Sequence, residues 1–245
     1  MLEKKHRLDS LLTEKGLAKS RQRAQALIMA GKVLVNGKPV DKPGFYVSTG
    51  DTLELKSEDI PYVSRGGLKL EAALNRFKLD VHDTICMDVG ASSGGFTDCL
   101  LQHGAQRVYA VDVGYGQLDW KLRQNPRVVV IERTNVRYMS ADAIPDRVDL
   151  VTIDVSFISL RIVVPAIMRF MRPAASILAL IKPQFEVGKG QVGKGGVVRE
   201  PKLHQQVVDD LTDFFATIKL KAEDVYPCPL LGPKGNREFF ILLRQ

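Results

Sequence analysis

The sequence predicts two domains: a small mixed α+β domain, followed by a larger α/β domain with helices packed on both faces of a mostly parallel sheet. Two patterns predict this division. Residues 1 to about 59 contain two short helical patterns followed by short extended runs, whereas from Thr84 onward longer apolar runs alternate with helical patterns. A polar stretch that ends at Pro61 lies between them and is typical of a linker. We therefore assign residues 1–59 to the first domain and residues 60–245 to the second.

The composition favours a nucleic acid as the partner. The 245 residues include 35 lysines and arginines against 28 acids, and the isoelectric point is near 9.3. The sequence contains no run of eighteen apolar residues and no signal-peptide pattern at its start, so we expect a cytoplasmic protein that does not enter a membrane. Its three cysteines and four histidines are scattered without metal-ligand spacing, which supports neither a disulfide framework nor a metal site.

In the small domain, apolar residues within 8–12 and 24–28 recur at helical spacing and predict two short helices. Gly16 is expected to end the first helix and Ser20 to cap the second. The residues that follow alternate as in strands, and the Asn36-Gly37 pair predicts a hairpin turn. Small antiparallel hairpins are therefore expected after the helices.

The two predicted helices are rich in positive charge. Between Lys4 and Arg23 there are seven lysines and arginines against two acids. Such a density suits the binding of RNA phosphates, yet it is equally typical of a solvated helix face. Composition alone leaves both interpretations open.

The large domain is expected to form a mixed sheet of seven strands. A helix that begins near Ser64 precedes the sheet, and it places Lys69 beside its buried stripe of Leu70, Ala73, Leu74 and Phe77. The predicted strands lie near residues 84–90, 107–112, 128–132, 148–154, 176–182, 222–227 and 237–243.

The most informative stretch runs from Ile85 to Thr97, where an apolar strand leads through a glycine-rich turn into a helix. Such a turn directs backbone N–H groups and the positive end of a helix dipole at a carboxylate or phosphate. The next apolar strand ends in Asp112, which is well placed to accept both hydroxyls of a ribose. Together they predict a nucleoside site.

Three functional interpretations of this turn are considered. A dinucleotide fingerprint needs glycine where Ser92 stands. The turn also fits the nucleophile elbow G-x-S-x-G with Ser92 as nucleophile, but it follows the first strand of its sheet, and His204, the histidine found downstream of His103, lies in a helical pattern. The third is S-adenosylmethionine, with its amino-acid end at the turn and its ribose at Asp112, and this is the interpretation we favour. A glycine turn that merely packs is the remaining alternative.

Chemically active side chains follow several of the predicted strands. Ligands of doubly wound sheets bind at the carboxyl ends of the strands. Each such side chain alone could be an ordinary strand-end residue facing water, but their alignment favours a shared site. The residues at these ends are Gly90, Asp112, Asn135, Asp154 and Lys182.

The small domain resembles the S4 RNA-binding domain over nearly its whole length. The resemblance implies docking on structured RNA, often ribosomal, through the second helix, and it favours Lys19, Arg21 and Arg23 as contacts. The residues that carry it are Arg7-Leu8-Asp9, Gly16-Leu17-Ala18-Lys19-Ser20-Arg21, Ala24, Gly31, Val33, Val35-Asn36-Gly37, Lys42-Pro43 and Gly50-Asp51.

The large domain resembles the RrmJ/FtsJ class of S-adenosylmethionine-dependent RNA ribose 2′-O-methyltransferases, whose signature is a Lys-Asp-Lys-Glu tetrad. Four residues match the tetrad in order: Lys69, Asp154, Lys182 and Glu238. An S4 module joined to such a domain is the arrangement of the TlyA family, also labelled hemolysin A. The resemblance implies methylation of cytidine riboses in the RNA of the small and large ribosomal subunits. Asn135 departs from the RrmJ pattern, in which an aspartate meets the adenine, but an amide can still accept from the exocyclic amine.

Within this resemblance we assign three groups of residues. The catalytic group is Lys69, Asp154, Lys182 and Glu238. The cofactor-binding group is Asp88, Gly90, Ala91, Ser92, Ser93, Gly94, Gly95, Phe96, Asp112, Asn135 and Asp154. The RNA-binding group is Arg7, Lys19, Arg21, Arg23, Arg65, Lys189, Lys194 and Arg199.

The chemistry explains the residue types. A ribose 2′-hydroxyl is a very weak acid and must lose or share its proton as it attacks the methyl carbon. Lys182 is the candidate for that contact, either as a neutral base favoured by burial and by nearby Lys69, or as a cation that stabilises the developing oxyanion. Asp154 would orient Lys182, and Glu238 would hold Lys69. Alignment of the reactants is expected to contribute to the rate alongside acid–base chemistry.

Residues 187–199 form a glycine-rich basic loop. Gly188 to Lys194 fits G-x-x-x-x-G-K, but Gly195 replaces the Ser/Thr that would hold magnesium and no strand runs directly into the loop, so we reject an ATPase P-loop. A mobile flap that meets RNA phosphate near Lys182 and a plain surface loop are equally compatible with the sequence.

Two other functions are considered. A cytolysin, as the hemolysin label suggests, would need a signal peptide, a spanning segment or a strongly amphipathic helix, and the sequence shows none of these. An RNA-binding factor with an inactive methyltransferase fold is disfavoured by the complete tetrad.

Overall fold

A computed structural model describes residues 5–18, 20–55, 60–188 and 190–245. The chain forms two compact units, Met1–Pro61 and Tyr62–Gln245, each with its own core. Among the described residues, none of the helices has the length and apolar character needed to cross a membrane.

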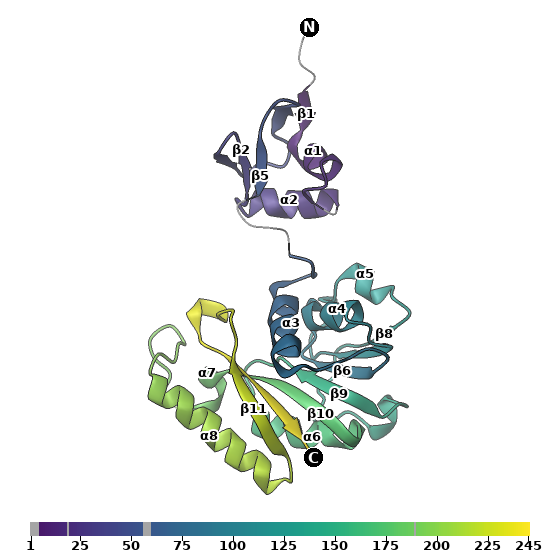
Figure 1. Ribbon diagram of the computed structural model, residues 1–245, viewed down its shortest axis with the longest axis vertical. Coiled ribbons are helices and arrows are strands. Elements are labelled where there is room, and N and C mark those ends of the chain that lie inside the picture. Colours follow the sequence, from purple (N-terminus) through teal and green to yellow (C-terminus); the bar gives the residue numbers. More distant parts are fainter. Residues whose placement is uncertain (1–4, 19, 56–59, 189) are drawn as a thin grey trace. The chain divides into compact units, whose positions relative to one another are not determined.

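The small unit pairs two helices with short antiparallel strands (Figure 1). Its elements are β1 (Lys5–Arg7), α1 (Leu8–Glu14), α2 (Arg21–Met29), β2 (Val33–Val35), β3 (Lys38–Val40), β4 (Tyr46–Ser48) and β5 (Leu53–Leu55). β1 pairs with β4, while β2 lies between β3 and β5 in a separate sheet. Leucines of α1 and the apolar face of α2 form the core, together with Val33 and Val47.

Two local expectations for this unit are confirmed. The Ser20 side chain accepts a hydrogen bond from the backbone N–H of Arg23 and so caps α2. Between β2 and β3, Asn36 and Gly37 both have positive φ, 50° and 75°, as a two-residue type I′ hairpin requires. The β1–β4 pair was not predicted from the sequence, because three-residue strands that pair across about forty residues leave no alternating pattern to detect.

The large unit is a seven-stranded mixed sheet with the strand order β11-β12-β10-β9-β6-β7-β8. β12 is antiparallel to both of its neighbours, and the other pairs are parallel. The strands are β6 (Ile85–Val89), β7 (Arg107–Val111), β8 (Val128–Ile131), β9 (Val148–Ile153), β10 (Met171–Ile181), β11 (Lys221–Pro227) and β12 (Phe239–Arg244). The helices are α3 (Arg65–Phe77), α4 (Gly95–Gln102), α5 (Trp120–Arg123), α6 (Leu160–Ile167), α7 (Pro183–Glu186) and α8 (Pro201–Thr217), with short 3₁₀ turns at Ala141–Ala143, Met168–Phe170 and Pro233–Gly235.

The sheet separates two apolar cores, as the alternation of side chains along buried strands requires. In β6, Cys86 belongs to the core shared with α3 and α4, whereas Met87 and Val89 belong to the core shared with α6 and α8. α8 lies alongside β11 at one edge of the sheet (Figure 1). The predicted doubly wound architecture and its seven strands are confirmed.

Glycines allow α3 to approach α4 closely where both helices begin. A Cβ atom at Gly95 would collide with the Ser64 hydroxyl and lie 2.9 Å from the backbone nitrogen of Gly67, and a Cβ at Gly67 would collide with the Tyr62 ring. The Val63 N–H also donates to an Asp98 carboxylate oxygen at 2.8 Å. These contacts fix the start of α3 and therefore the position of Lys69, which lies one turn further along the helix.

Asp88 links three elements beneath the glycine-rich turn. Its carboxyl group is completely buried, and it accepts hydrogen bonds from Thr97 of α4 at 2.7 Å and from Thr152 of β9 at 3.3 Å. Burial raises the pKa of Asp88 to about 7, an effect that the Thr97 hydrogen bond opposes and the charge of Asp154 reinforces. The protonation state of Asp88 therefore changes near neutral pH.

Asp88→Asn is expected to remove a pH dependence from the stability of the large unit. Because the pKa of Asp88 is about 7 in the folded protein and about 3.9 when unfolded, the stability that its protonated form contributes is fully present below about pH 4 and is lost as the pH rises through about 7. The melting temperature of the variant minus that of the wild type should therefore increase from about pH 5 to about pH 9.

Thermal unfolding followed by circular dichroism measures this difference, and Asp142→Asn, at an exposed acid of the same unit, is the control. A difference in melting temperature between Asp88→Asn and the wild type that stayed constant over this pH range would contradict a raised pKa of Asp88.

Candidate functional site

Two adjoining clefts open at the carboxyl ends of the parallel strands. One, of about 580 Å³, is lined by Asp112, Asn135 and the residues that follow β9, and we call it the Asp112 cleft. The other, of about 640 Å³, is lined by Lys69, Lys182, the glycine-rich turn and the loop before β12, and we call it the lysine cleft. Residues common to both are Gly90, Ser92, Asp154 and Ser156. A ligand in one cleft would therefore reach a ligand in the other at Asp154.

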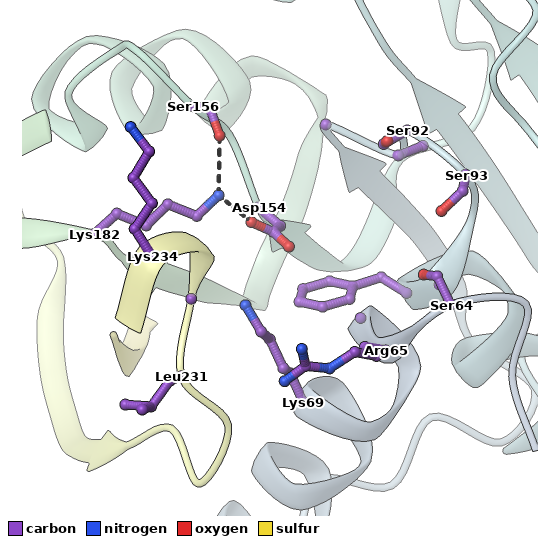
Figure 2. Close-up of a pocket in the computed structure, with 16 residues that line it drawn as sticks. Ser64, Arg65, Lys69, Ser92, Ser93, Asp154, Ser156, Lys182, Leu231 and Lys234 are labelled. Carbon is purple, nitrogen blue, oxygen red and sulfur yellow. Dashed lines mark hydrogen bonds and ion pairs between the residues drawn. The ribbon is translucent and has the colours of Figure 1, made fainter. Parts of the chain in front are cut away.

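The lysine cleft contains two short ion pairs. The Lys182 Nζ lies 2.5 Å from an Asp154 carboxylate oxygen and donates to the Ser156 hydroxyl at 3.2 Å, and the Lys69 Nζ lies 2.5 Å from Glu238. In Figure 2 the amino groups of Lys69 and Lys182 approach the Asp154 carboxylate from two sides of the cleft. The four side chains predicted as a tetrad therefore come together in this fold.

The members of this group differ in exposure. The Lys69 side chain is 12% exposed and that of Lys182 is 10% exposed, while that of Glu238 is completely buried behind Lys69. Removing Lys69 would leave a buried carboxylate without its counter-ion, which is far more costly than losing a surface ion pair. Glu238 therefore constrains Lys69, and only the lysine reaches the cleft.

Local structure explains how each side chain is held. Lys182 directly follows β10 and is the N-cap residue of α7, whose first helical residue is Pro183. Asp154 directly follows β9, and its N–H donates to the carbonyl of Val89 in β6. Glu238 precedes β12, and Gly232 packs so closely against its carboxylate that a side chain at position 232 would displace it.

In the Asp112 cleft, the glycine-rich turn and the loop after β7 hold the carboxylate of Asp112 in place. Its two oxygens accept hydrogen bonds from the backbone N–H groups of Ser92 at 2.8 Å and Gly114 at 2.6 Å. A carboxylate has about four lone-pair positions, so Asp112 can accept two further hydrogen bonds from a ligand. Gly90 has φ +88°, and a Cβ atom there would lie 2.5 Å from the Asp154 carbonyl oxygen, so glycine is required for this close approach.

The predicted cofactor residues divide between the clefts. Gly90, Ser92 and Asp154 line both, and Asp112 and Asn135 line the Asp112 cleft. Those that line the lysine cleft alone are Ala91, Ser93, Gly95 and Phe96. Two predicted residues line neither cleft: Asp88 lies buried beneath the turn, and Gly94 packs where a Cβ atom would collide with Leu118 and Leu122. Both residues shape the turn rather than face a ligand.

The nucleophile-elbow alternative needs a histidine hydrogen-bonded to the Ser92 hydroxyl, and none is found there in the described part of the chain. The Ser92 hydroxyl donates to the Gln117 side chain at 3.3 Å. The rings of His103 and His204 are hydrogen-bonded to the backbone carbonyls of Cys99 and Val198 instead. A serine without an adjacent base is a weak nucleophile, so acyl transfer at Ser92 is disfavoured.

The predicted RNA-binding residues lie in both units. Arg65 is exposed and lines the lysine cleft, while Arg7 and Arg21 of the small unit both contact Asp9. The backbone N–H of Arg23 takes part in the cap of α2, and Lys194 and Arg199 are exposed. Lys19 and Lys189 lie outside the described residues.

The glycine-rich loop after α7 is fastened at its far end. The buried side chain of Asn236 accepts from the Val198 N–H at 3.1 Å and donates to the Gly196 carbonyl at 3.0 Å. Because Asn236 lies two residues before Glu238, this end of the loop is joined to the segment that holds Lys69. This end is therefore not a free flap.

Some residues that line the clefts were not identified from the sequence. Phe157 is 90% exposed with φ +63°, and its ring lies 4.9 Å from that of Phe185. A positive φ is unusual for a bulky residue, and such backbone conformations are common at functional sites. Lys234, which also has positive φ, lines the lysine cleft. Phe157 and Lys234 belong to no periodic pattern. Only their position close to a strand end could have indicated from the sequence that they line a cleft.

Comparisons with known proteins agree with this geometry. The FtsJ-like methyltransferase family model matches residues 62–245, and the S4 domain model matches residues 6–53. The 16S/23S rRNA (cytidine-2′-O)-methyltransferase TlyA of Mycobacterium tuberculosis is 48% identical over 244 residues, which cover 99% of this chain and 91% of that protein.

Solved structures give the same result. A Streptococcus thermophilus protein named as a hemolysin superposes with a TM-score of 0.77 at 45% identity, covering 98% of this chain and 88% of that chain. An S-adenosylmethionine-dependent methyltransferase from Listeria monocytogenes, at 14% identity and a TM-score of 0.55, shares the fold over 73% of this chain and 98% of that one. By its FtsJ-like domain, its S4 domain and its similarity over the full length, the chain belongs to the TlyA family of FtsJ-like methyltransferases.

Proposed function

We propose that the chain transfers a methyl group from S-adenosylmethionine to a ribose 2′-hydroxyl of ribosomal RNA, with cytidine as the target nucleotide. One observation carries the proposal: the Asp112 cleft and the lysine cleft meet at Asp154, beside the Lys182 amino group. The name of the Mycobacterium tuberculosis relative supports the choice of substrate. Such RNA is found in the cytoplasm, and we propose that the protein works there.

The residues of the Asp112 cleft fit the proposed cofactor. The free lone pairs of Asp112 suit the two ribose hydroxyls, Asn135 offers an amide to the adenine, and the turn at Gly90 leaves room for the amino-acid end close to the backbone. When bound, S-adenosylmethionine supplies an electrophilic methyl group. Asp154, which lines both clefts, would set where that group meets the substrate.

Lys182 is the residue that we propose contacts the 2′-hydroxyl. Two roles fit its position between Asp154 and Ser156. A neutral amine would accept the hydroxyl proton while the oxygen forms its bond to the methyl carbon and the bond from that carbon to the donor sulfur breaks, whereas an ammonium would stabilise the negative charge that develops on that oxygen. In both roles Asp154 and Ser156 fix the direction of the lysine, so alignment contributes to the rate as well.

The surroundings of the lysine cleft suit a nucleotide of an RNA chain. Arg65 and Lys234 line the cleft together with the two lysines, and a cleft with this charge attracts phosphates. Phe157, which lines the adjoining Asp112 cleft and is exposed beside Phe185, offers a flat surface on which an unstacked base can lie. The S4 unit would add contacts that hold the RNA without reading its sequence.

Lys182→Ala is expected to lower the rate of methyl transfer to rRNA by roughly 10²-fold or more, the usual range for a lost acid–base group. Lys182→Arg separates the two roles, because arginine keeps the positive charge but cannot act as a base near neutral pH. Tritiated S-adenosylmethionine and purified ribosomal subunits or deproteinised rRNA provide the assay.

The control for this series is Lys221→Ala at an exposed lysine of β11, which should retain wild-type rates. Substantial activity in Lys182→Arg would identify charge stabilisation as the role of the lysine. Transfer at the wild-type rate by Lys182→Ala would refute the assignment, and no transfer by the intact chain to any RNA would refute the proposed function.

Asp112→Ala should weaken binding of S-adenosylmethionine by roughly tenfold or more, because it removes charged hydrogen-bond acceptors from the ribose position. Isothermal titration calorimetry with the full chain measures the affinity. Asp142→Asn, which alters an exposed acid of the same unit, should bind as the wild type does. Equal affinities for Asp112→Ala and the wild type would place the cofactor elsewhere.

The target nucleotide can be located directly. Ribose 2′-O-methylation arrests reverse transcriptase at low nucleotide concentration, so primer extension on both rRNAs before and after treatment reveals each modified position. We expect new stops at cytidines that depend on the cofactor and disappear with Lys182→Ala. Stops at other bases would contradict cytidine as the target.

A further inference from the structure

In the small unit, a buried acid lies beneath the arginines that the sequence assigns to RNA. The Asp9 carboxylate is completely buried, although it belongs to the first turn of α1 in a strongly basic region. Arg7 binds it through two atoms, with Nε donating to one oxygen at 3.1 Å and Nη2 to the other at 2.9 Å. From α2, Arg21 donates through its Nε at 3.2 Å and Gln25 through its amide at 2.8 Å.

These contacts restrict two long side chains that remain accessible. The Arg7 side chain is 40% exposed and that of Arg21 is 56% exposed, so both can still meet a partner. The two-atom contact fixes the plane of the Arg7 guanidinium, and the single Nε contact of Arg21 leaves its terminal amino groups outside the bond to Asp9. Arg7 comes from β1 and Arg21 from α2, so Asp9 also fixes one guanidinium relative to the other.

The arrangement persists over the whole working pH range. The hydrogen bond from Arg7, together with those from Gln25 and Arg21, holds the pKa of Asp9 well below its usual range, although burial opposes this. Asp9 therefore stays ionised. Backbone packing supports the same geometry, because Gly44 leaves space for Arg7: a Cβ atom at position 44 would lie 3.3 Å from its Nη1.

We propose that Asp9 is a positioning residue for RNA binding, which presets Arg7 and Arg21 as a paired phosphate-binding site on the S4 unit. The inference rests on the proposed function, since RNA phosphates are the partner that these arginines would bind. A flexible arginine loses rotamer freedom when it binds a phosphate, whereas an arginine already held by Asp9 loses less.

Charge alone predicts the opposite effect of removing the acid. Two arginines and one carboxylate give this cluster a net charge of +1, and without the carboxylate it becomes +2. If long-range attraction to RNA decided the affinity, neutralising Asp9 would strengthen binding. If orientation decides, neutralising Asp9 weakens binding although the protein becomes more positive. The sign of the change therefore separates the two mechanisms.

Asp9→Asn in the full chain tests the proposal against Asp41→Asn, which neutralises an exposed acid of the same unit. The probe is transcribed 23S and 16S rRNA in filter binding at several salt concentrations. Asp9→Asn is expected to weaken binding by about tenfold, since two side chains lose their preset orientation, while Asp41→Asn binds as well as or better than the wild type. In the methyl-transfer assay the loss should appear in KM for rRNA rather than in kcat, because Lys182 is untouched.

A second variant leaves the carboxylate and every charge in place. Gly44→Ala should move the Arg7 guanidinium by a small amount and weaken RNA binding by about threefold, the cost of an off-rotamer side chain. The backbone tolerates alanine because Gly44 does not have positive φ. Circular dichroism melting of each variant shows whether the S4 unit is folded, and if Asp9→Asn does not fold, Gly44→Ala decides.

The double variant Arg7→Ala/Arg21→Ala separates this inference from the proposed function. If it loses RNA affinity while folded Asp9→Asn and Gly44→Ala bind as the wild type does, the arginines bind RNA without the help of Asp9 and the inference is overturned. Tighter binding by Asp9→Asn overturns it too. If the double variant keeps full affinity, this face does not bind RNA and the inference is refuted, while label transfer to rRNA still tests the enzymatic function independently.

Discussion

The ion pair between Lys182 and Asp154 depends on the register of two neighbouring parallel strands. β9 and β10 pair in parallel with Ile153, the last residue of β9, opposite Ala179, two residues before the end of β10, so Asp154 and Lys182 follow neighbouring strand ends. A slip of one residue would turn every side chain of one strand to the other face of the sheet and separate the pair. Two apolar cores, one on each face, specify this register, and the polar chemistry at the strand ends is therefore determined by apolar packing below it.

In both units buried or half-buried acids determine where the positive charges lie. Glu238 holds Lys69, Asp154 holds Lys182 and Asp9 holds Arg7 together with Arg21. A protein with a formal net charge of +7 has charge in excess for attracting RNA. Orienting these side chains is harder, because lysine and arginine have much rotamer entropy. A fixed carboxylate supplies the orientation. The acids therefore hold the positive side chains at defined positions, which net charge alone would not do.

The fold could be predicted from the sequence almost completely, because buried parallel strands are apolar runs between glycine and proline signals. The site could be predicted in part. Gly90 and Asp112 stand at strand ends within a recognisable strand–turn–helix, whereas Lys69 and Glu238 are 169 residues apart and no local pattern connects them. Only the resemblance to a known family grouped them. Phe157 and the buried position of Asp88 could not be predicted, since both depend on how three separate strands and their loops meet.

The contact between the glycine-rich turn and the end of β9 explains why the two clefts are continuous. A side chain at position 90 would push the turn away from the Asp154 carbonyl and enter the junction between the clefts. The same turn is supported from below by Asp88, whose pKa is raised by burial and, to a smaller extent, by the charge of Asp154. Asp88 also accepts a hydrogen bond from Thr152 of β9, so the turn and the end of β9 are joined beneath the clefts as well as at Gly90. The two clefts are therefore continuous because the turn is held against β9 both at Gly90 and from beneath by Asp88.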